Sequence, residues 1–383
     1  MAIVYCSELL SRVFFEETLD SACALAECIE SPSCAEVVRW YHATMLTEPE
    51  QASSSQACDL ETFVPAELRS LPDLQRDIPR IAKDTRSTSV IEAAIGSIPT
   101  RHDYRLGDAR LMDFLEPESV HLVVTSPPYW TLKEYRRSED QLGYIQDYEQ
   151  FLEELDRVWQ HCFRALVPGG RLVCVVGDVC LSRRNNNGRH VVVPLHASIQ
   201  EHCRRIGFDN LAPIIWHKIA NATYEVQGAG GFLGKPYEPN AVIKNDIEYI
   251  LMQRKPGGYR KPSSAKRILS VISVSDHQRW FQQIWTGLTG ASTRNHPAPY
   301  PIEIAHRLIR MFSFVGDTVL DPFHGTGSTS VAAARSGRNS IGVETDVVYF
   351  EKSCRRFAEE TSSMFSQRTL NVLRDDQTKQ EIS

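Results

Sequence analysis

The sequence lacks several features that would place it in a specialised class. No apolar run reaches the roughly 18 residues that a membrane-spanning helix needs, and the N-terminal residues do not form a signal-peptide pattern. The ten cysteines stand at positions 6, 23, 28, 34, 58, 162, 174, 180, 203 and 354, and none forms a Cys-x-x-Cys pair. We therefore expect a cytoplasmic protein with reduced, mostly buried thiols, no metal site and no membrane partner.

An overall excess of basic residues is also lacking. The formal net charge is −6, from 42 Lys and Arg against 48 Asp and Glu. Residues 1–100 hold 16 acids and 7 bases, a net of −9 that leaves +3 for the remainder. The segment 251–295 is rich in bases and contains a single acidic residue, Asp276. A local basic patch governs phosphate contact, so this segment is a candidate nucleic-acid surface, with a solvated loop as the alternative.

The 383 residues suffice for one large α/β domain with an accessory piece. Residues 1–95 have apolar positions at helical spacing, interrupted by a polar stretch at 48–57. From about 102 the chain alternates between strand and helix patterns. We expect strands at 104–109, 120–124, 171–178 and 212–218, and helices at 146–165 and 194–206. A Gly/Pro-rich loop is expected at 228–240, an antiparallel edge strand at 246–255, and an irregular basic segment at 256–295 whose Trp280 and Trp285 contact DNA or anchor a small core.

The stretch Thr125-Ser126-Pro127-Pro128-Tyr129-Trp130 follows the apolar run 120–124. Two consecutive prolines cannot extend a sheet, because both lack an amide donor and both fix φ. The strand must therefore stop and hold a hydroxyl and an aromatic ring at its carboxyl end, where open α/β sheets bind ligands. Taken alone, a stiff Pro-Pro loop is the competing interpretation.

A second motif runs from Val319 to Thr329, where an apolar strand ends in Asp321 and a Gly-x-Gly turn leads into a helix. Glycines let the backbone approach a ligand closely, and the helix start presents free amides. The next strand ends in Glu344, an acid well placed to hold ribose hydroxyls in a βαβ unit. The motif departs from the dinucleotide GxGxxG pattern, which argues against NAD, and His324 is interpreted as a spacer in the turn.

These motifs resemble those of S-adenosylmethionine-dependent amino-group DNA methyltransferases. TSPPYW resembles motif IV of that family, DPFHGTGST resembles motif I, the strand ending at Glu344 resembles motif II, and 296–301 with the following helix resembles motif X. Because the catalytic motif precedes the cofactor motifs, the order resembles the permuted β class. The resemblance covers about 102–360 and implies a Rossmann-like α/β fold with a helical N-terminal extension and an inserted DNA-recognition region.

The resemblance also implies roles for individual residues. Ser126, with the Pro127 carbonyl, would accept hydrogen bonds from the amino group of a flipped base, and Tyr129 would stack on that base. The expected catalytic set is Ser126, Pro127, Pro128 and Tyr129. The expected S-adenosylmethionine-binding set is Asp108, Thr125, Pro301, Asp321, Pro322, Phe323, Gly325, Gly327, Ser328, Thr329 and Glu344. The candidate DNA-binding set is Lys235, Tyr237, Arg254, Arg260, Lys261, Lys266, Arg267 and Arg294.

Ser126 preceded by Thr125 resembles the cytosine-N4 members, whereas adenine-N6 members more often carry Asp at that position. We therefore predict a cytosine-N4 DNA methyltransferase, with adenine-N6 as the alternative. RNA methylation is a third interpretation, and a non-catalytic regulator that binds the cofactor or DNA is a fourth. Asp108 can accept from an adenine amino group or cap a helix.

The predicted organisation has five parts. A helical extension spans 1–95, the catalytic half 96–255, the target-recognition region 256–295, the cofactor-binding half 296–365 and a polar tail 366–383. The expected partner is double-stranded DNA in a bacterial or archaeal cell, at the nucleoid, with a restriction endonuclease as a further candidate. The sequence leaves the recognition site open, and leaves the choice between monomer and homodimer open.

Overall fold

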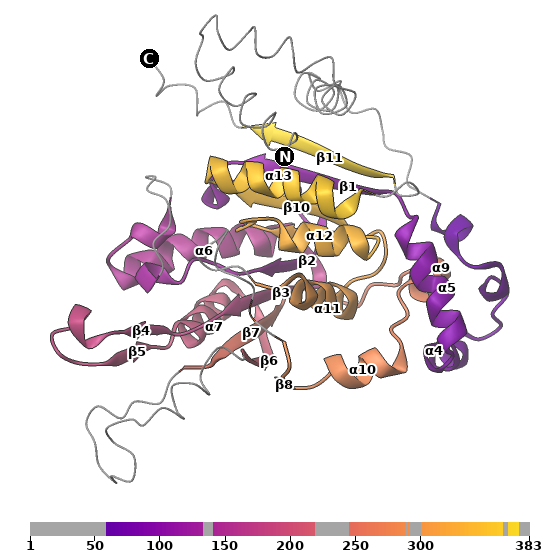
Figure 1. Ribbon diagram of the computed structural model, residues 1–383, viewed down its shortest axis with the longest axis horizontal. Helices are drawn as coiled ribbons and strands as arrows, with labels where there is room; N and C mark the ends of the chain where they lie inside the picture. The colour runs from indigo at the N-terminus through magenta and orange to yellow at the C-terminus, as the bar shows by residue number, and fades with distance from the viewer. Residues whose placement is uncertain are drawn as a thin grey trace, which may run out of the picture. The chain divides into compact units, whose positions relative to one another are not determined.

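The computed structural model describes residues 59–132, 141–218, 245–288, 290, 300–362 and 367–374 (Figure 1). Its centre is a nine-stranded sheet in the order β11-β1-β10-β9-β2-β3-β7-β6-β8. The strands are β1 (Thr100–Leu106), β2 (Val120–Thr125), β3 (Leu166–Val176), β6 (Asp209–His217), β7 (Ile247–Arg254), β8 (Ile284–Trp285), β9 (Thr318–Asp321), β10 (Asn339–Glu344) and β11 (Arg368–Arg374).

The sheet order differs from the chain order at one informative place. Strands β9 and β10, late in the chain, lie between the early strands β1 and β2, and all four are parallel. Their carboxyl ends therefore share one edge of the sheet, which we call the carboxyl edge. The expected α/β fold with a Rossmann-like, permuted sheet is confirmed.

Helices cover both faces of the sheet. Helices α6 (Tyr148–Ala165) and α7 (Leu195–Ile206) pack their apolar sides against one face of the sheet. Helix α11 (Ile302–Phe312) packs against the other face. Helices α12 (Ser328–Arg335) and α13 (Val347–Thr361) cover β1 and β10. No helix of the described residues is long and apolar enough to cross a membrane.

A third group of helices lies at the opposite, amino edge of the sheet. Helices α4 (Leu74–Lys83) and α5 (Thr85–Gly96) share a hydrophobic cluster with α9 (Ser264–Leu269) and with Val315, which precedes β9. The compact unit thus begins at Asp59, and residues 59–95 are part of its packing. The helical prediction for 59–95 is confirmed, while residues 1–58 lie outside the described part.

The Pro-Gly-Gly segment at 168–170 lies within β3 and forms a bulge instead of a separate turn. Between the pairs Val120–Leu166 and Leu122–Arg171, β2 advances two residues while β3 advances five. Gly169 has a φ of +78°, and a Cβ there would come within 2.9 Å of the Gly258 carbonyl oxygen. The glycine is therefore required both by its left-handed backbone and by the close approach of the segment at Gly258.

Two strand-level predictions are wrong. Strand β7 is antiparallel as expected, but it lies inside the sheet between β3 and β6 and not at its edge. The segment 256–295 is not irregular in its described part, because it contains α9, α10 (Val274–Trp280) and β8. Trp280 and Trp285 are buried there, so they anchor a core and do not offer rings to DNA.

Candidate active site

The TSPPYW stretch begins where β2 ends. Thr125 is buried, and its hydroxyl donates to the Asp321 carboxylate at 2.7 Å, which ties the end of β2 to the end of β9. The prolines then take the chain out of the sheet, and Trp130 has a φ of +45°. A left-handed backbone is unfavourable for a bulky residue. It is held here because the Trp130 indole N–H donates to the Ile145 carbonyl and its ring packs on Tyr148.

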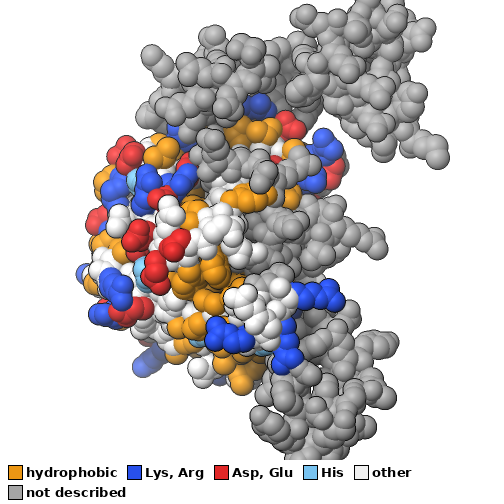
Figure 2. All heavy atoms as spheres, turned by 90° about the vertical axis from the view of Figure 1, so that its left-hand side faces the viewer, with side chains coloured by type: hydrophobic (Ala, Val, Ile, Leu, Met, Phe, Trp, Pro, Cys, Tyr) orange, Lys and Arg blue, Asp and Glu red, His pale blue; other side chains and the backbone are white. Residues whose placement is uncertain are grey.

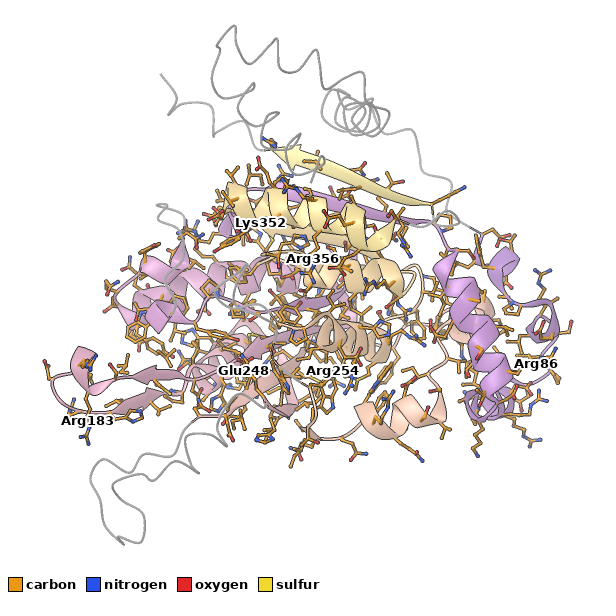
Figure 3. All side chains as sticks on the ribbon, viewed as in Figure 1. Arg86, Arg183, Glu248, Arg254, Lys352 and Arg356 are labelled. Atoms are coloured by element: carbon orange, nitrogen blue, oxygen red, sulfur yellow. The ribbon has the colours of Figure 1, made fainter. Side chains whose placement is uncertain are left out.

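Ser126 belongs to a chain of polar atoms that reaches a neighbouring strand. Its Oγ lies 3.3 Å from the Tyr129 hydroxyl, which lies 3.5 Å from Oε2 of Glu248 on β7. The other Glu248 oxygen accepts from Lys218 at 2.7 Å. Neither Glu248 nor Lys218 was singled out from the sequence, because pairing across the sheet, not a motif, brings them to Ser126. In Figure 3, Glu248 lies on the left of Arg254, toward the carboxyl edge.

Tyr129 does not present an open stacking face. Its side chain is only 7% exposed and packs with the hydrophobic cluster of α6 and β3. The expectation of a base stacked on this ring therefore requires its neighbours to move first. The structure instead places the Tyr129 hydroxyl between Ser126 and Glu248.

Asp321 is the centre of a buried hydrogen-bond cluster. It accepts from the hydroxyls of Thr125 and Thr329 and from the Phe323 amide. Burial raises its pKa to about 6, although these donors act in the opposite direction. Tyr300 joins the cluster through the Thr329 hydroxyl. The carboxylate thus joins β2, β9 and the start of α12 into one frame.

Glu344 ends β10 and is also buried. Its Oε2 accepts from the Gly325 amide at 2.7 Å, and its Oε1 accepts from the Asp346 amide at 2.9 Å. Burial raises its pKa to about 7, well above the ordinary 4.5. The glycine turn after Asp321 and the acid after β10 therefore form one unit.

A cavity at the carboxyl edge brings the two motifs together. Among the predicted residues, its lining includes Asp108, Ser126, Pro128, Pro322, Phe323, Gly325 and Glu344. The sequence missed Gln141, Leu142, Thr345 and Tyr349, which complete the lining with Gly107, Ala109 and Val343. Thr345 and Tyr349 follow Glu344 closely, so their position was a usable signal. No signal in the sequence pointed to Gln141 or Leu142.

The remaining predicted cofactor residues form the frame behind this cavity. Pro301 precedes the first residue of α11, and Gly327, with a φ of +82°, precedes the first residue of α12. Ser328 donates to the Tyr300 carbonyl and accepts from Arg356. The predicted region 296–299 lies outside the described residues.

Asp108 has the capping role that was one of its two predicted possibilities. Its carboxylate caps a short helical turn by accepting from the Arg110 amide, and it also binds the Arg110 guanidinium. The residue nevertheless lines the cavity. A cap and a place in the pocket are therefore compatible.

His324 is more than a spacer in the glycine turn. It is buried, its ring lies 4.3 Å from that of Tyr104, and a Cβ on Gly342 would come within 2.4 Å of it. Burial lowers its pKa to about 3, so it is neutral and fills the space behind the turn.

Three of the five predicted DNA-binding bases that the structure describes are held by acids of the chain. Arg254 binds Asp209, while Arg260 and Lys266 both bind Asp317, which is fully buried. Arg254 ends the antiparallel strand β7 and Asp317 precedes β9, so these pairs lie at the amino edge, away from Ser126.

Arg260 and Lys266, in the described part of 256–295, therefore lie at the amino edge, and their contact with DNA stays a prediction. Arg267 lines a groove with α4 residues at the same amino edge, and Lys261 lies just before α9. Lys235, Tyr237 and Arg294 lie outside the described residues. Formal charge along the chain does not show which acids will neutralise it.

Comparison with known proteins adds an independent line of evidence. Residues 120–355 match the family model N6_N4_Mtase, described as DNA methylase. The chain is 40% identical over 278 residues to the type II methyltransferase M.MjaI of Methanocaldococcus jannaschii, covering 65% of this chain and 88% of that protein. It is 36% identical over 269 residues to M.MthZI of Methanothermobacter thermautotrophicus, covering 64% of this chain and 74% of that protein.

Among solved structures, the model resembles a putative DNA modification methylase from Thermus thermophilus, TTHA0409, crystallised with S-adenosyl-L-methionine. The identity is 53%, with 71% of this chain and 98% of that chain covered and a TM-score of 0.59.

Proposed function

We propose that this chain, which belongs to the DNA methylase family N6_N4_Mtase, methylates the exocyclic N4 of cytosine in duplex DNA. It is a type II amino-group DNA methyltransferase that uses S-adenosylmethionine. One observation carries the proposal furthest: Ser126 and Pro128 of the TSPPYW stretch line the same cavity as Gly325 and Glu344. The acceptor base and the cofactor would thus meet in one pocket.

The cavity suits the cofactor in its shape and in its polar groups. Glu344 lines the cavity, and its ionised carboxylate can accept hydrogen bonds from ribose hydroxyls. Phe323 and Tyr349 offer apolar surface for an adenine ring. Gly325 leaves the turn open for close approach. When bound, S-adenosylmethionine supplies a methyl group whose bond to sulfur breaks as a bond to nitrogen forms, after which the nitrogen loses a proton.

The hydrogen bonds from Ser126 through Tyr129 to Glu248 determine where the Ser126 hydroxyl directs its proton. A carboxylate only accepts hydrogen bonds, so the Tyr129 hydroxyl donates to Glu248. The Tyr129 oxygen is then the acceptor for Ser126, whose own proton is committed. Two lone pairs on Ser126 remain free to accept from the base amino group. Glu248 is therefore proposed as a positioning residue that keeps Ser126 an acceptor.

An acceptor is what the chemistry of an amino group requires. The lone pair of an exocyclic base nitrogen is delocalised into the ring, which makes the nitrogen a poor nucleophile. Acceptors against its two hydrogens, Ser126 and the Pro127 carbonyl, would favour localising that pair as the new bond forms. The base must leave the duplex to reach this pocket, at a cost of a few kcal/mol.

Ser126 in place of an aspartate is the feature that favours cytosine over adenine. Adenine-N6 methylation is the alternative, because both bases present an amino group beside a ring nitrogen. A non-catalytic regulator is less well supported, since Ser126, Asp321 and Glu344 are all present and all bonded as catalysis would need.

The test is product analysis. The protein is incubated with methyl-labelled S-adenosylmethionine and duplex DNA of mixed sequence, the DNA is digested, and the nucleosides are separated. Label in N4-methylcytosine is the expected result. Label in N6-methyladenine would contradict the choice of base, and Ser126→Ala serves as the catalytically impaired control.

A further inference from the structure

A small two-stranded sheet separate from the main one carries a basic tip. It consists of β4 (Val179–Leu181) and β5 (Val191–Val193), and we call residues 179–193 the β4–β5 ribbon. Its sequence, VCLSRRNNNGRHVVV, contains three arginines and a histidine but no acid. Nothing in the sequence analysis singled it out, because it has neither a motif nor a long charge run.

The ribbon is rooted beside the catalytic motif. It follows β3 at the carboxyl edge after only Gly177 and Asp178, and β4 lies against the turn Trp130–Leu132. Val179 is fully buried, and Leu181 and Val193 pack on the same hydrophobic cluster as Trp130. The base of the ribbon is therefore fixed with respect to Ser126.

The tip is a closed, hydrogen-bonded turn. The Arg183 carbonyl accepts from the Gly188 amide at 3.0 Å, and the Asn186 carbonyl accepts from the Arg189 amide at 2.9 Å. Asn187 and Gly188 have φ values of +47° and +77°, which residues of these two types adopt most readily. The turn thus holds Arg184 and Arg189 on a defined backbone.

These two arginines differ from the bases at the amino edge. Arg184 and Arg189 are exposed, and neither has an acidic partner among the residues that the structure describes. Figure 3 places Arg183 at the outer end of the ribbon, on the lower left. Figure 2, which views the molecule from that side, shows Lys and Arg side chains on the upper and on the lower part of the described surface.

From this juxtaposition we infer that the β4–β5 ribbon is a DNA-contacting arm, whose Arg184 and Arg189 bind backbone phosphates next to the target base. The inference rests on the proposed function, which brings duplex DNA to the carboxyl edge. A two-stranded ribbon fits the major groove, about 12 Å wide, and guanidinium groups pair well with phosphate oxygens. Two arginines on a ribbon whose base lies beside the catalytic motif would orient the duplex without reading its sequence.

The experiment compares DNA affinity across salt concentrations for the wild-type protein and three double variants. Each phosphate contact contributes about 0.9 to the slope of log K against log[salt], so R184A/R189A should reduce the slope by about 1.8. The matched control is R76A/R86A, which removes two arginines from α4 and α5 at the other end of the molecule, where Figure 3 labels Arg86. This control should keep the wild-type slope.

Folding is checked by S-adenosylmethionine affinity, which all three double variants should retain. R184K/R189K keeps the charges and should recover most of the slope, which a purely structural role of the arginines would not predict. The inference is overturned if R184A/R189A has the slope of the control, or if it weakens binding without changing the slope. Failure of the proposed function would look different, because the wild-type protein itself would then transfer no methyl group to DNA.

Discussion

Cofactor affinity should depend on pH through Glu344. The carboxyl group lies in the cavity wall, and burial raises its pKa to about 7 before the cofactor binds. Ribose hydroxyls that donate to it would stabilise the ionised form and lower that pKa. Binding is then favoured when Glu344 is already ionised, so affinity should rise as the pH rises through 7.

The size of the effect follows from the two protonation states. With a pKa of about 7 in the free protein, roughly 3% of Glu344 is ionised at pH 5.5 and about 90% at pH 8. If the pKa in the complex lies below about 4.5, the affinity should differ by roughly 30-fold between these pH values, or about 2 kcal/mol. Calorimetry in two buffers of different ionisation enthalpy should also show that binding near pH 6 releases close to one proton.

Glu344→Gln isolates this contribution. Asp321, with a pKa of about 6, titrates nearby but is not among the residues that line the cavity, and the variant leaves it in place. The variant should bind more weakly at pH 8 and lose most of the pH dependence. A wild-type affinity that is flat between pH 5.5 and 8, or a Glu344→Gln variant with the wild-type slope, would refute the assigned role.

Three further predictions concern the acceptor chain and the amino-edge ion pairs. Ser126→Ala and Tyr129→Phe should each reduce methyl transfer by roughly 100-fold or more while cofactor binding persists, and a loss of binding instead would show that the roles are misassigned. Glu248→Gln should lower kcat about tenfold, since an amide can donate and reverse the hydrogen-bond chain; single-turnover assays at saturating DNA would show an unchanged rate if Glu248 does not orient Ser126. Asp317→Asn should lower the free energy of unfolding by about 3 kcal/mol in urea titrations, because Arg260 loses its buried partner, and a change below about 0.5 kcal/mol would contradict the structural role of this pair.

Much of the fold was predictable because its signals are local. The apolar run before Thr125, the apolar face of α6, and the glycine turn between Asp321 and α12 each determine one element from neighbouring residues. The permuted order of strands followed from the order of the motifs. Asp321 and Glu344 were recognisable because an acid that ends an apolar strand beside a glycine turn is typical of a ligand-binding βαβ unit.

The errors have a common physical cause: interaction partners that lie far apart in the sequence cannot be identified from local sequence patterns. Arg260 was taken for a free cation because Asp317, its partner, lies 57 positions later. Strand β7 was taken for an edge strand, but it pairs with β3 on one side and with β6 on the other. Glu248 went unnoticed for the same reason, since only its register opposite β3 brings it to Tyr129.

The most direct test of the central claim is the identity of the labelled nucleoside after incubation with labelled S-adenosylmethionine and duplex DNA. Radioactivity that co-migrates with N4-methylcytosine, and that Ser126→Ala abolishes, is the predicted result. Label in no base, from a protein that binds S-adenosylmethionine normally, would contradict it.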